Sequence, residues 1–455
     1  MKPVRRVLVA NRGEIAVRVI SACHKLGIES VLAASEADLD ALPARLAGRV
    51  ICIGPAAAAQ SYLLAPTIVH AALSAHCDAI HPGYGFLSEN AVFAELCEKN
   101  GVTFIGPRPQ TMHNLGDKLR ARALAKQCGI PLLPGSSRVE SAVQAEDLVR
   151  DIGYPVLLKA SAGGGGRGMK VATDAISLRS GFETATAEAL ASFGDGTLFL
   201  ERFVPRARHV EVQILGDGEG GIIHLGERDC SVQRRYQKVI EEAPAPALAA
   251  ELVQKIRDAA VRLANAAGYR SAGTVEFLVD PETARYYFLE VNTRIQVEHP
   301  VTEMVTGIDI VGEQLRIASG TGLSQRQDGV RFSGHAIEMR INAESPAHGF
   351  RPSPGRIAAW RPPVGSHIRL DTHCHEGYLV PPYYDSLLAK LIVTGCDRPT
   401  AIENARQALA NFVIEGVQTT LPFLERVLAE AAFHNAAHHT RWAEELLQQQ
   451  DGVLA

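Results

Sequence analysis

The chain has 455 residues, enough for two to four domains with complete cores, and its 46% hydrophobic and 21% charged residues are typical of a folded enzyme rather than a disordered protein. A formal net charge of −4 argues against non-specific nucleic-acid binding as the main role. The eight cysteines form no Cys-x-x-Cys pair, which favours free thiols over a disulfide framework or a zinc knuckle.

We expect neither a secretory signal nor a membrane span. Only residues 7–10 form an apolar run after the basic start, and such a run is too short for a signal peptide. No apolar run approaches the ~18 residues of a spanning helix. The sequence therefore predicts a soluble, cytoplasmic protein without a membrane partner.

Residues 1–115 alternate short apolar runs with helical patterns such as residues 14–26. The expected strands cover residues 7–10, 30–34, 50–53, 79–80 and 103–105. This alternation predicts parallel strands with crossover helices, that is, a doubly wound α/β domain. Ligands of such sheets bind beyond the carboxyl ends of the strands, where we expect the polar loops 11–14 and 81–90.

A basic helical segment at 116–133 is predicted to be a linker, and a small unit follows at 134–203. Its centre is a glycine-rich run after Lys159, and residues 169–172 are predicted to form a strand, so the run is expected in a hairpin rather than in a dinucleotide fingerprint. Glycines offer free N–H groups and little bulk, so they can close over phosphates as a mobile lid. The lid glycines are Gly163, Gly164, Gly165 and Gly166. A merely flexible hairpin is the alternative.

Residues 204–330 contain an alternating strand at 209–214, a dense basic and amide run at 227–238 that suits anionic ligands, and a strand at 274–279. In an extended strand, alternate residues of the stretch 290–300 share one face. The residues on that face are Glu290, Asn292, Arg294, Gln296 and Glu298. The alternative is an ordinary strand whose polar face is solvated. Glu276 and Glu290 on neighbouring strands, with Asn292, are hard oxygen ligands suited to Mg²⁺ that carries nucleotide phosphates.

Residues 331–446 are predicted to complete an α+β layer, with a strand near 391–393 and a helix at 400–412. A strand from residue 335 places Glu338, Arg340, Asn342 and Glu344 on one face. His373 and His375 permit a metal-site hypothesis, but the nearby sequence supplies no third ligand. Residues 447–455 are expected to be a frayed tail.

With these pieces laid out, the chain resembles biotin carboxylase, the ATP-grasp component of biotin-dependent carboxylases, over almost its whole length. The resemblance rests on residues 10–16, 81–90, 116–118, 159–168, 227–238, 290–300, 340–344 and 381–386. It implies an N-terminal α/β domain at 1–115, an ATP-grasp lid at 134–203, an ATP-grasp core at 204–330 and a C-terminal α+β domain at 331–446.

The resemblance also implies a role for each candidate residue. The nucleotide, ATP, would contact Lys118, Lys159, Glu201, His209, Gln233 and Tyr236, with the lid glycines over its phosphates. The metal, Mg²⁺ or Mn²⁺, would be held by Glu276 and Glu290 with Asn292 close by. Bicarbonate would be seated by Lys238, Arg294, Gln296 and the backbone of Val297, with Glu298 as general base. Arg340 would face the biotin ureido oxygen, with Tyr84 nearby.

The expected chemistry fits these residue types. Bicarbonate is a poor nucleophile until it is deprotonated, so a carboxylate in reach beside two cations is what the first step requires. Attack on the γ-phosphate gives carboxyphosphate and ADP. By resemblance, carboxyphosphate breaks into CO₂ and phosphate, phosphate removes the N1′ proton of biotin, and the biotin nitrogen attacks CO₂. A closed lid keeps water from these unstable species.

The chain departs from the family pattern in a few places. Tyr236 stands where the family commonly has His, Arg202 replaces a Lys beside the adenine, and Ala162 replaces the first glycine of the loop. These changes bear on nucleotide binding, and none removes a proposed catalytic group. Ser21, Lys25 and Ser366 differ from the residues that bacterial relatives place at their dimer contact, although a homodimer is still expected.

The expected partners are a separate biotin carboxyl carrier protein and carboxyltransferase subunits. A carrier domain would display Met-Lys-Met, and the only Met-Lys pairs here are at residues 1–2 and 169–170. The whole enzyme would be acetyl-CoA carboxylase of fatty acid biosynthesis or another acyl-CoA carboxylase, and the acyl acceptor is left open. Two alternatives stay open as well: another ATP-grasp ligase of the carbamoyl-phosphate or purine-pathway type, and a non-catalytic paralogue.

Overall fold

The computed structural model describes residues 3–161 and 169–451. The predicted lid glycines, Gly163, Gly164, Gly165 and Gly166, lie outside these ranges, as does Ala162. Across the described residues, every helix is too short or too polar to cross a bilayer.

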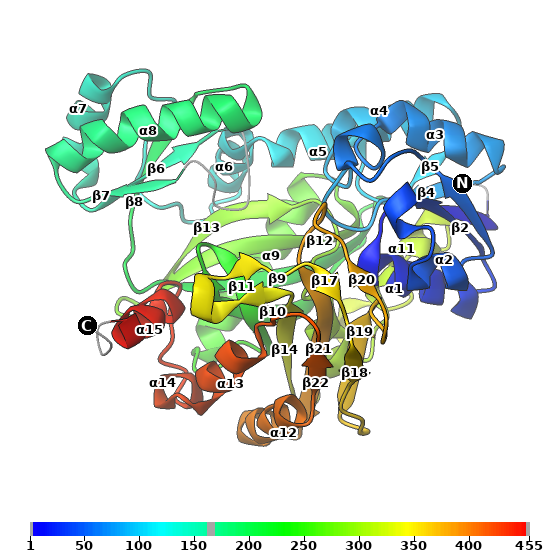
Figure 1. Cartoon of the computed structure of the whole chain (residues 1–455). Coiled ribbons are helices and arrows are strands. Elements are labelled where there is room, and N and C mark those ends of the chain that lie inside the picture. Colours follow the sequence, from blue (N-terminus) through cyan, green and yellow to red (C-terminus); the bar gives the residue numbers. More distant parts are fainter. Residues whose placement is uncertain (1–2, 162–168, 452–455) are drawn as a thin grey trace.

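The N-terminal part is a parallel sheet with helices on both faces (Figure 1), which confirms the predicted doubly wound domain. Its strands run in the order β3-β2-β1-β4-β5, with β1 Arg6–Val9, β2 Glu29–Ala34, β3 Arg49–Cys52, β4 Ala79–His81 and β5 Thr103–Phe104. Its helices are α1 Gly13–Lys25, α2 Leu42–Leu46, α3 Ala65–Ser74, α4 Ala91–Lys99 and α5 Pro109–Gly116. Val7 and Val9 of β1 pack in one core with α1, whereas Leu8 packs in a second core with α3 and α4. Both faces of the sheet are therefore covered, as parallel sheets require.

Helix α6 Lys118–Gln127 leads to a small unit with its own apolar core. Its elements are α7 Ala142–Ile152, β6 Val156–Ala160, β7 Lys170–Ala172, α8 Ala175–Phe193 and β8 Leu198–Arg202. The strands form an antiparallel sheet in the order β7-β6-β8, and the unit projects from the rest of the molecule in Figure 1. Asp174 caps the N-terminus of helix α8, because its carboxylate accepts from the backbone N–H of Ser177 at 2.8 Å.

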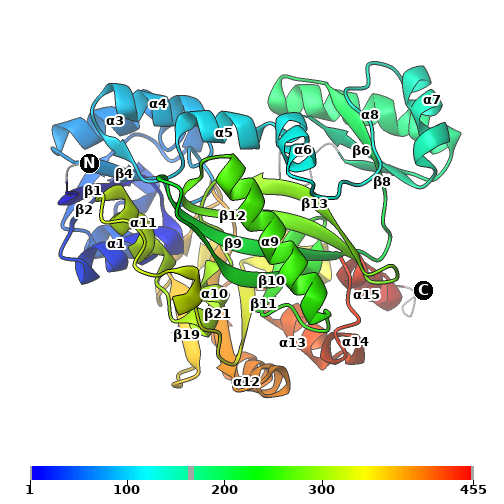
Figure 2. The same ribbon diagram turned by 180° about the vertical axis from the view of Figure 1, so that it is seen from behind.

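The centre of the molecule is an eight-stranded antiparallel sheet in the order β13-β12-β9-β10-β11-β14-β21-β19. Its strands are β9 Arg208–Asp217, β10 Ile222–Arg234, β11 Gln237–Ala243, β12 Arg270–Asp280, β13 Arg285–Asn292, β14 His335–Asn342, β19 Ile368–Thr372 and β21 Leu387–Gly395. Val210, Val212 and Ile214 of β9 pack in one core with helix α9 Ala250–Ala266, which lies across the sheet in Figure 2. The alternate residues of β9, His209 and Glu211 among them, therefore point to the other face.

The last part of the chain shares this central sheet, because β14 pairs with β11 and β21 pairs with β14. Its helices are α12 Arg398–Ala410, α13 Leu421–Ala429, α14 Ala431–His434 and α15 Trp442–Asp451, so residues 447–451 of the predicted tail are helical. Helices α10 His299–Thr306 and α11 Ile310–Ala318 connect β13 to this part. The domain limits given above stay predictions.

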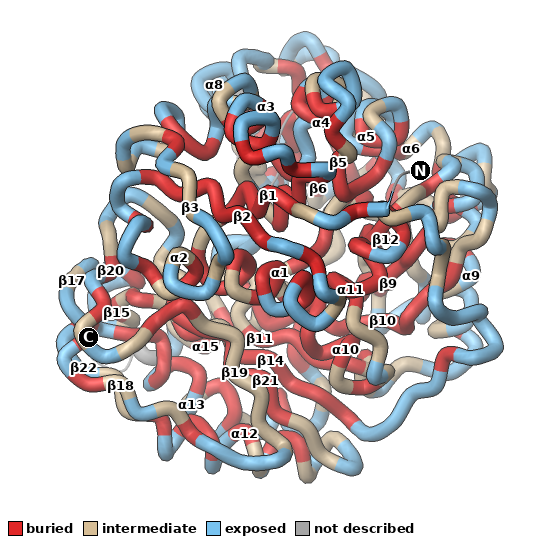
Figure 3. The backbone as a smooth tube through the Cα atoms, turned by 90° about the vertical axis from the view of Figure 1, so that its right-hand side faces the viewer, coloured by how far each residue is buried: buried red, intermediate tan, exposed pale blue. Residues whose placement is uncertain are grey.

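The remaining elements are short. They are strands β15 Glu344–Ser345, β16 Arg351–Pro352, β17 Gly355–Arg356, β18 Ala359–Arg361, β20 Leu379–Val380 and β22 Val413–Glu415, and the 3₁₀ turns Glu36–Asp38, Ala58–Gln60, Gln327–Gly329 and Pro346–His348. In Figure 3 the buried backbone gathers in the inner strands of both large sheets and in α1, while many exposed stretches lie in the outer loops.

Candidate active site

A cavity of about 740 Å³ lies where the N-terminal part, the lid unit and the central sheet meet. Most of the residues singled out from the sequence line it: Tyr84, Lys118, Lys159, Glu201, His209, Gln233, Tyr236, Lys238, Glu276, Glu290, Asn292, Arg294, Gln296, Val297 and Arg340. Glu298 lies just behind the wall, fully buried. The structure thus gathers side chains that are up to 256 positions apart, Tyr84 and Arg340 being the extremes of the set.

Lys238 is the electrostatic centre of the site. Its Nζ donates to Glu211 at 2.5 Å, to Glu276 at 3.0 Å and to Glu298 at 2.6 Å. Burial works to lower the pKa of Lys238, but these three carboxylates outweigh burial and raise that pKa well above its usual range. Lys238 is therefore a fixed positive charge at any physiological pH.

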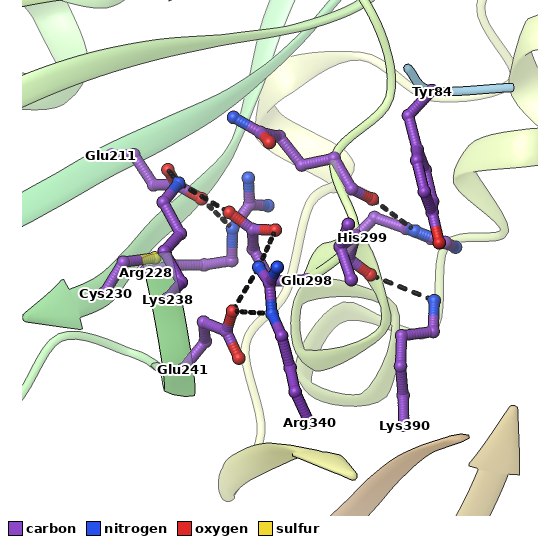
Figure 4. A network of polar contacts seen from close by, with 12 residues as sticks. Tyr84, Glu211, Arg228, Cys230, Lys238, Glu241, Glu298, His299, Arg340 and Lys390 are labelled. Carbon is purple, nitrogen blue, oxygen red and sulfur yellow. Dashed lines mark hydrogen bonds and ion pairs between the residues drawn. The ribbon is translucent and has the colours of Figure 1, made fainter. Parts of the chain in front are cut away.

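Glu298 lies between two cations, as Figure 4 shows. Its Oε1 accepts from Lys238, and its Oε2 accepts from Nη2 of Arg340 at 2.9 Å. Burial works to raise the pKa of Glu298, but Lys238 and then Arg340 hold it below its usual range. Nε of Arg340 also donates to Glu241 at 2.6 Å, so the guanidinium is held between two buried carboxylates.

The prediction of one extended strand through residues 290–300 is wrong beyond Asn292. Strand β13 ends at Asn292, and residues 293–298 form a loop that leads into α10. The loop is held by the sheet, since Lys390 of β21 donates to the carbonyl of Val297 at 3.0 Å. The side chains still converge, because the amides of Asn292 and Gln296 both donate to Oε1 of Glu276, at 2.8 and 3.1 Å.

Arg294 lies at the same place as these amides. Its guanidinium donates to Oδ1 of Asn292 at 3.2 Å, to Oε1 of Gln296 at 3.1 Å and to Glu89 at 2.9 Å. Arg294, Glu298, Lys238 and Glu276 therefore belong to one continuous network of contacts.

The candidate metal ligands lie on neighbouring strands. Glu276 of β12 is directly opposite Glu290 of β13 in the register. Nζ of Lys118, 3.6 Å away, is the cation paired with Glu290, so the Glu290 carboxylate keeps oxygen lone pairs for a metal. His209, Glu211 and Glu276 also bring ligand atoms within 4.8 Å, but Glu211 is already paired with both Lys238 and Arg228. The donor set of Glu276, Glu290 and Asn292 thus fits Mg²⁺ or Mn²⁺ better.

The opposite end of the cavity combines cations with apolar walls. Lys159 of β6 is buried and forms an ion pair with Glu201 of β8, which Arg122 also contacts. Apolar side chains complete this end: Leu133, Leu157, Met169, Leu278 and Leu289. Apolar walls beside buried cations suit the purine base and the phosphates of a nucleotide.

Tyr236 and Gln233 lie between the two ends. Nε2 of Gln233 and Nδ1 of His209 are 2.7 Å apart. Tyr236 is at the turn between β10 and β11 with a φ of +64°, a conformation that non-glycine residues rarely adopt. Glu444 of α15 holds this turn by accepting from the N–H of Arg235 at 2.7 Å.

The interpretation of residues 227–238 as one anion-binding run is wrong for its first half. Arg228 is completely buried, and its guanidinium donates to Glu211, Gln213, Thr274 and Thr302. Asp229 is likewise buried and is paired with Arg208 at 2.7 Å. These charges are internal ion pairs of the sheet, and only Gln233, Tyr236, Gln237 and Lys238 of the run line the cavity.

Two residues of the site escaped prediction from the sequence. Glu211 was not singled out, although it lies two positions from His209 on the same face of a strand with clear alternation. Glu14 was also missed. It accepts from the hydroxyl of Tyr84 and pairs with the buried Lys390 at 3.1 Å, which ties the N-terminal part to the loop at Val297.

His373 and His375 do not form a metal site with the residues the structure describes. His373 is buried beside Gly13, and burial lowers its pKa to about 3.

Comparison with known protein families matches three segments of the chain. Residues 3–112 match the family model "Biotin carboxylase, N-terminal domain", residues 117–326 match "Carbamoyl-phosphate synthase L chain, ATP binding domain", and residues 338–445 match "Biotin carboxylase C-terminal domain".

Individual relatives match almost from end to end. The chain is 51% identical over 442 residues to biotin carboxylase 1 of Bacillus subtilis, covering 97% of this chain and 98% of that protein. It is 46% identical over 441 residues to a pyruvate carboxylase subunit of Methanothermobacter thermautotrophicus, covering 97% of this chain and 89% of that protein. A crystal structure of the biotin carboxylase domain dimer of Hydrogenobacter thermophilus 2-oxoglutarate carboxylase, with MgADP and bicarbonate, superposes with a TM-score of 0.94 at 46% identity and covers 98% of each chain.

Proposed function

The chain belongs to the biotin carboxylase family of ATP-grasp enzymes, and from this premise we propose that it carboxylates biotin with ATP and bicarbonate through carboxyphosphate. The observation that carries the proposal is the position of Glu298, with one oxygen on Lys238 and the other on Arg340. Glu298 is therefore next to Lys238, the cation proposed for bicarbonate, and next to Arg340, the cation proposed for biotin.

The first step is the deprotonation of bicarbonate. Glu298 takes the proton, and Lys238 with Arg294 stabilises the dianion that results. Gln296 and the backbone of Val297 would complete the seat, and Lys390 fixes the position of Val297. The network of contacts described above keeps these groups in one place before substrate arrives.

The second step is attack of the carbonate dianion, formed by deprotonation of bicarbonate, on the γ-phosphate of ATP. Lys118 and Lys159 line the cavity and would neutralise phosphate oxygens, and His209, Gln233, Glu201 and Tyr236, which also line it, would surround the remaining part of the nucleotide. Glu276 and Glu290, with Asn292, would hold Mg²⁺ or Mn²⁺, which when bound supplies charge neutralisation for phosphoryl transfer.

The last step uses Arg340 and Tyr84. Carboxyphosphate gives CO₂ and phosphate, phosphate removes the N1′ proton of biotin, and Arg340 stabilises the enolate-like ureido oxygen while the nitrogen attacks CO₂. Tyr84 is fixed at the cavity by its hydrogen bond to Glu14.

The test is bicarbonate-dependent ADP release, measured with and without free biotin. We expect biotin to stimulate turnover, and Glu298→Gln to lower it by about 100-fold, the usual scale for a general base. A variant as fast as the parent would remove Glu298 from the mechanism. ADP release that does not depend on bicarbonate would favour another ATP-grasp ligase. No ADP release at all would favour a non-catalytic role.

We propose that biotin is presented by a separate carrier protein and that carboxyltransferase subunits use the product. Relatives named biotin carboxylase support an acyl-CoA acceptor such as acetyl-CoA, in fatty acid biosynthesis. Relatives from pyruvate and 2-oxoglutarate carboxylases are about as similar, so the acceptor needs its own test. Purification of the chain from its own cells with its partners, followed by assays with acetyl-CoA, pyruvate and 2-oxoglutarate, distinguishes them.

We also propose a homodimer, in keeping with the dimer of the Hydrogenobacter relative. A second cavity of about 450 Å³, lined by Arg18, Ser21, Lys25 and Arg369 among others, marks the expected face. Light scattering should give twice the mass of the chain, and Lys25→Glu should weaken the association. A monomer at all concentrations would contradict this assembly.

The cysteines support a cytoplasmic location. All eight are free, and Cys23, Cys77, Cys97, Cys230 and Cys374 are buried. Free thiols persist in reducing compartments. We propose that the protein works in the cytoplasm, and cell fractionation tests this directly.

A further inference from the structure

Two buried carboxyl groups lie side by side behind the site, and the steps proposed above use neither of them for proton transfer. Glu241 of β11 is directly opposite Glu338 of β14 in the register of the central sheet. Both residues are fully buried. Directly opposed side chains on antiparallel strands have Cβ atoms about 5 Å apart, so these carboxyl groups are neighbours.

Three of the four carboxyl oxygens of this pair are unsatisfied within the part of the chain that the structure describes. Oε2 of Glu241 and both oxygens of Glu338 have no hydrogen-bond partner among the described residues. Two ionised carboxylates at this place would repel each other and would leave buried charge without a donor. One proton between them removes both penalties, because a neutral acid donates to the oxygen of an ionised one.

Charged groups face this pair from several elements. Arg340 contacts Oε1 of Glu241, and Glu298 is on the far side of that guanidinium. Lys238 lies on β11 with Glu241, and Lys390 of β21 is opposite Arg340 in the register. Lys390 already contacts Val297, Glu14 and Asp371, so within the described ranges no cation donates to Glu338.

We propose that Glu241 and Glu338 form an acid dyad that holds one proton and takes up the proton that Glu298 removes from bicarbonate. This inference rests on the function proposed above. The O–H bond of bicarbonate breaks as one forms on Glu298. That bond then breaks as an O–H bond forms on Glu241, and its electron pair returns Glu298 to the carboxylate form. The proton leaves Glu241 for solvent before the next turnover.

The geometry allows the transfer. Oε2 of Glu298 and Oε1 of Glu241 both contact Nη2 of Arg340. Two oxygens that share one nitrogen are separated by no more than two hydrogen bonds end to end, a gap that a single water spans. Once Glu241 is protonated, Glu298 is the one member of this carboxylate pair that still neutralises Arg340, which leaves more of the guanidinium charge for the biotin oxygen. Proton uptake would thus prepare the later step.

The pKa directions agree with this arrangement. Burial raises the pKa of Glu241 to about 7, against the opposing effect of Arg340. Burial also raises the pKa of Glu338 well above its usual range, so Glu338 is the member that carries the resting proton. Glu241 is then ionised above about pH 7 and ready to accept.

Infrared difference spectroscopy tests the resting proton without any substrate. Glu338→Gln should remove a neutral-acid C=O band, whereas Glu241→Gln should remove carboxylate bands and leave the neutral-acid band in place. Glu313→Gln, at a buried glutamate outside the site, is the matched control and should remove no neutral-acid band. If Glu338→Gln removes carboxylate bands and leaves the neutral-acid band in place, the dyad is overturned.

Kinetics test the uptake of the proton. In the parent, kcat at saturating substrates should fall as the pH drops below about 7, because a neutral Glu241 cannot accept. Glu241→Gln should lower kcat about 10-fold at alkaline pH, leave KM for bicarbonate unchanged and abolish this acid limb. A merely structural role would not remove the limb, so an intact limb in Glu241→Gln contradicts the proposal.

Two variants at the other position complete the test. Glu338→Gln keeps a donor toward Glu241, so the limb should stay at the pH that it has in the parent. Glu338→Leu removes the donor, which raises the pKa of Glu241, so the limb should shift to higher pH. Equal profiles for the two variants would contradict the dyad. If the parent shows no bicarbonate-dependent turnover, the proposed function fails while the infrared result still decides whether the dyad exists.

Discussion

Oε1 of Glu298 lies 2.6 Å from Nζ of Lys238. The proposed general base is thus held by the cation that would stabilise the anion it creates. A base lowered in pKa by such a cation is weaker in itself, but the same cation stabilises the product of the proton transfer. The contact therefore links two roles, and either partner can be changed to test it.

Replacing Lys238 by Gln should be severe. Glu211, Glu276 and Glu298 would lose their common cation, and breaking a buried ion pair costs about 3–5 kcal/mol of stability. We expect kcat/KM for bicarbonate to fall by about 100-fold or more, with a lower midpoint in urea. Lys255→Gln, on the exposed side of α9, is the matched control and should change neither. A stable, active Lys238→Gln protein would contradict the role of this lysine.

Arg340→Lys should distinguish the biotin step from the bicarbonate step. A lysine ammonium is a point charge and does not present the planar fork that contacts Glu298 and Glu241 together. We expect biotin-stimulated turnover to fall about 100-fold, while slow bicarbonate-dependent ATP hydrolysis without biotin persists. Parallel ADP-release assays with and without biotin measure the split. An equal loss of both activities would place Arg340 in the bicarbonate step instead.

Glu290→Gln should act through the metal. Glu290 is opposite Glu276, and Lys118, at 3.6 Å, is the cation with which it pairs, so its loss leaves little buried charge unpaired. We expect the Mg²⁺ concentration for half-maximal activity to rise about 10-fold with little change in stability. Titration of activity with Mg²⁺ and with Mn²⁺ provides the measurement. An unchanged dependence of activity on Mg²⁺ and Mn²⁺ would show that the metal does not bind at this pair of strands.

Acid stability should depend on Asp229, a buried carboxylate that is outside the lining of the cavity. Burial works to raise the pKa of Asp229, but Arg208 and then His438 hold it far below its usual value of 3.8. A carboxylate with a lowered folded pKa contributes stability above the unfolded value, and that contribution is lost as the pH falls below it. Asp229→Asn should therefore cost about 3–5 kcal/mol at neutral pH, and the difference should narrow below about pH 4.

Urea unfolding across this pH range measures that difference. Asp258→Asn is the control, because Asp258 is exposed on α9 and accepts only from Gln254 among the described contacts. A gap between parent and Asp229→Asn that stays constant down to pH 3 would show that the ion pair does not set acid stability.

Local patterns were sufficient for the N-terminal fold. Apolar runs such as Val7 to Ala10, separated by amphipathic segments, indicate covered parallel strands because polar water-facing positions are missing. Local pattern alone made the predicted strand of the stretch 290–300 too long. Alternation continues through Arg294 and Gln296, but tertiary contacts from Lys390 and Glu276 turn the chain after Asn292.

Pairing of buried charge lay beyond sequence reasoning. Nothing local distinguishes Arg228, which is neutralised inside the sheet by Glu211, from Lys238, which faces the cavity. The partners of Arg228 come from strands β9 and β12 and from α10. The tertiary structure is needed to show which charges meet. The same holds for Glu241 and Glu338, which are 97 positions apart in sequence and adjacent in the sheet.

The most direct test of the account follows oxygen from bicarbonate. If Glu298 activates bicarbonate for attack on the γ-phosphate, turnover with ¹⁸O-labelled bicarbonate in unlabelled water must place label in the phosphate product, in step with carboxylation of biotin. Mass spectrometry of the phosphate gives the answer. Label in the phosphate that Glu298→Gln suppresses about 100-fold is the predicted result. Phosphate that carries oxygen from water alone would contradict the central claim.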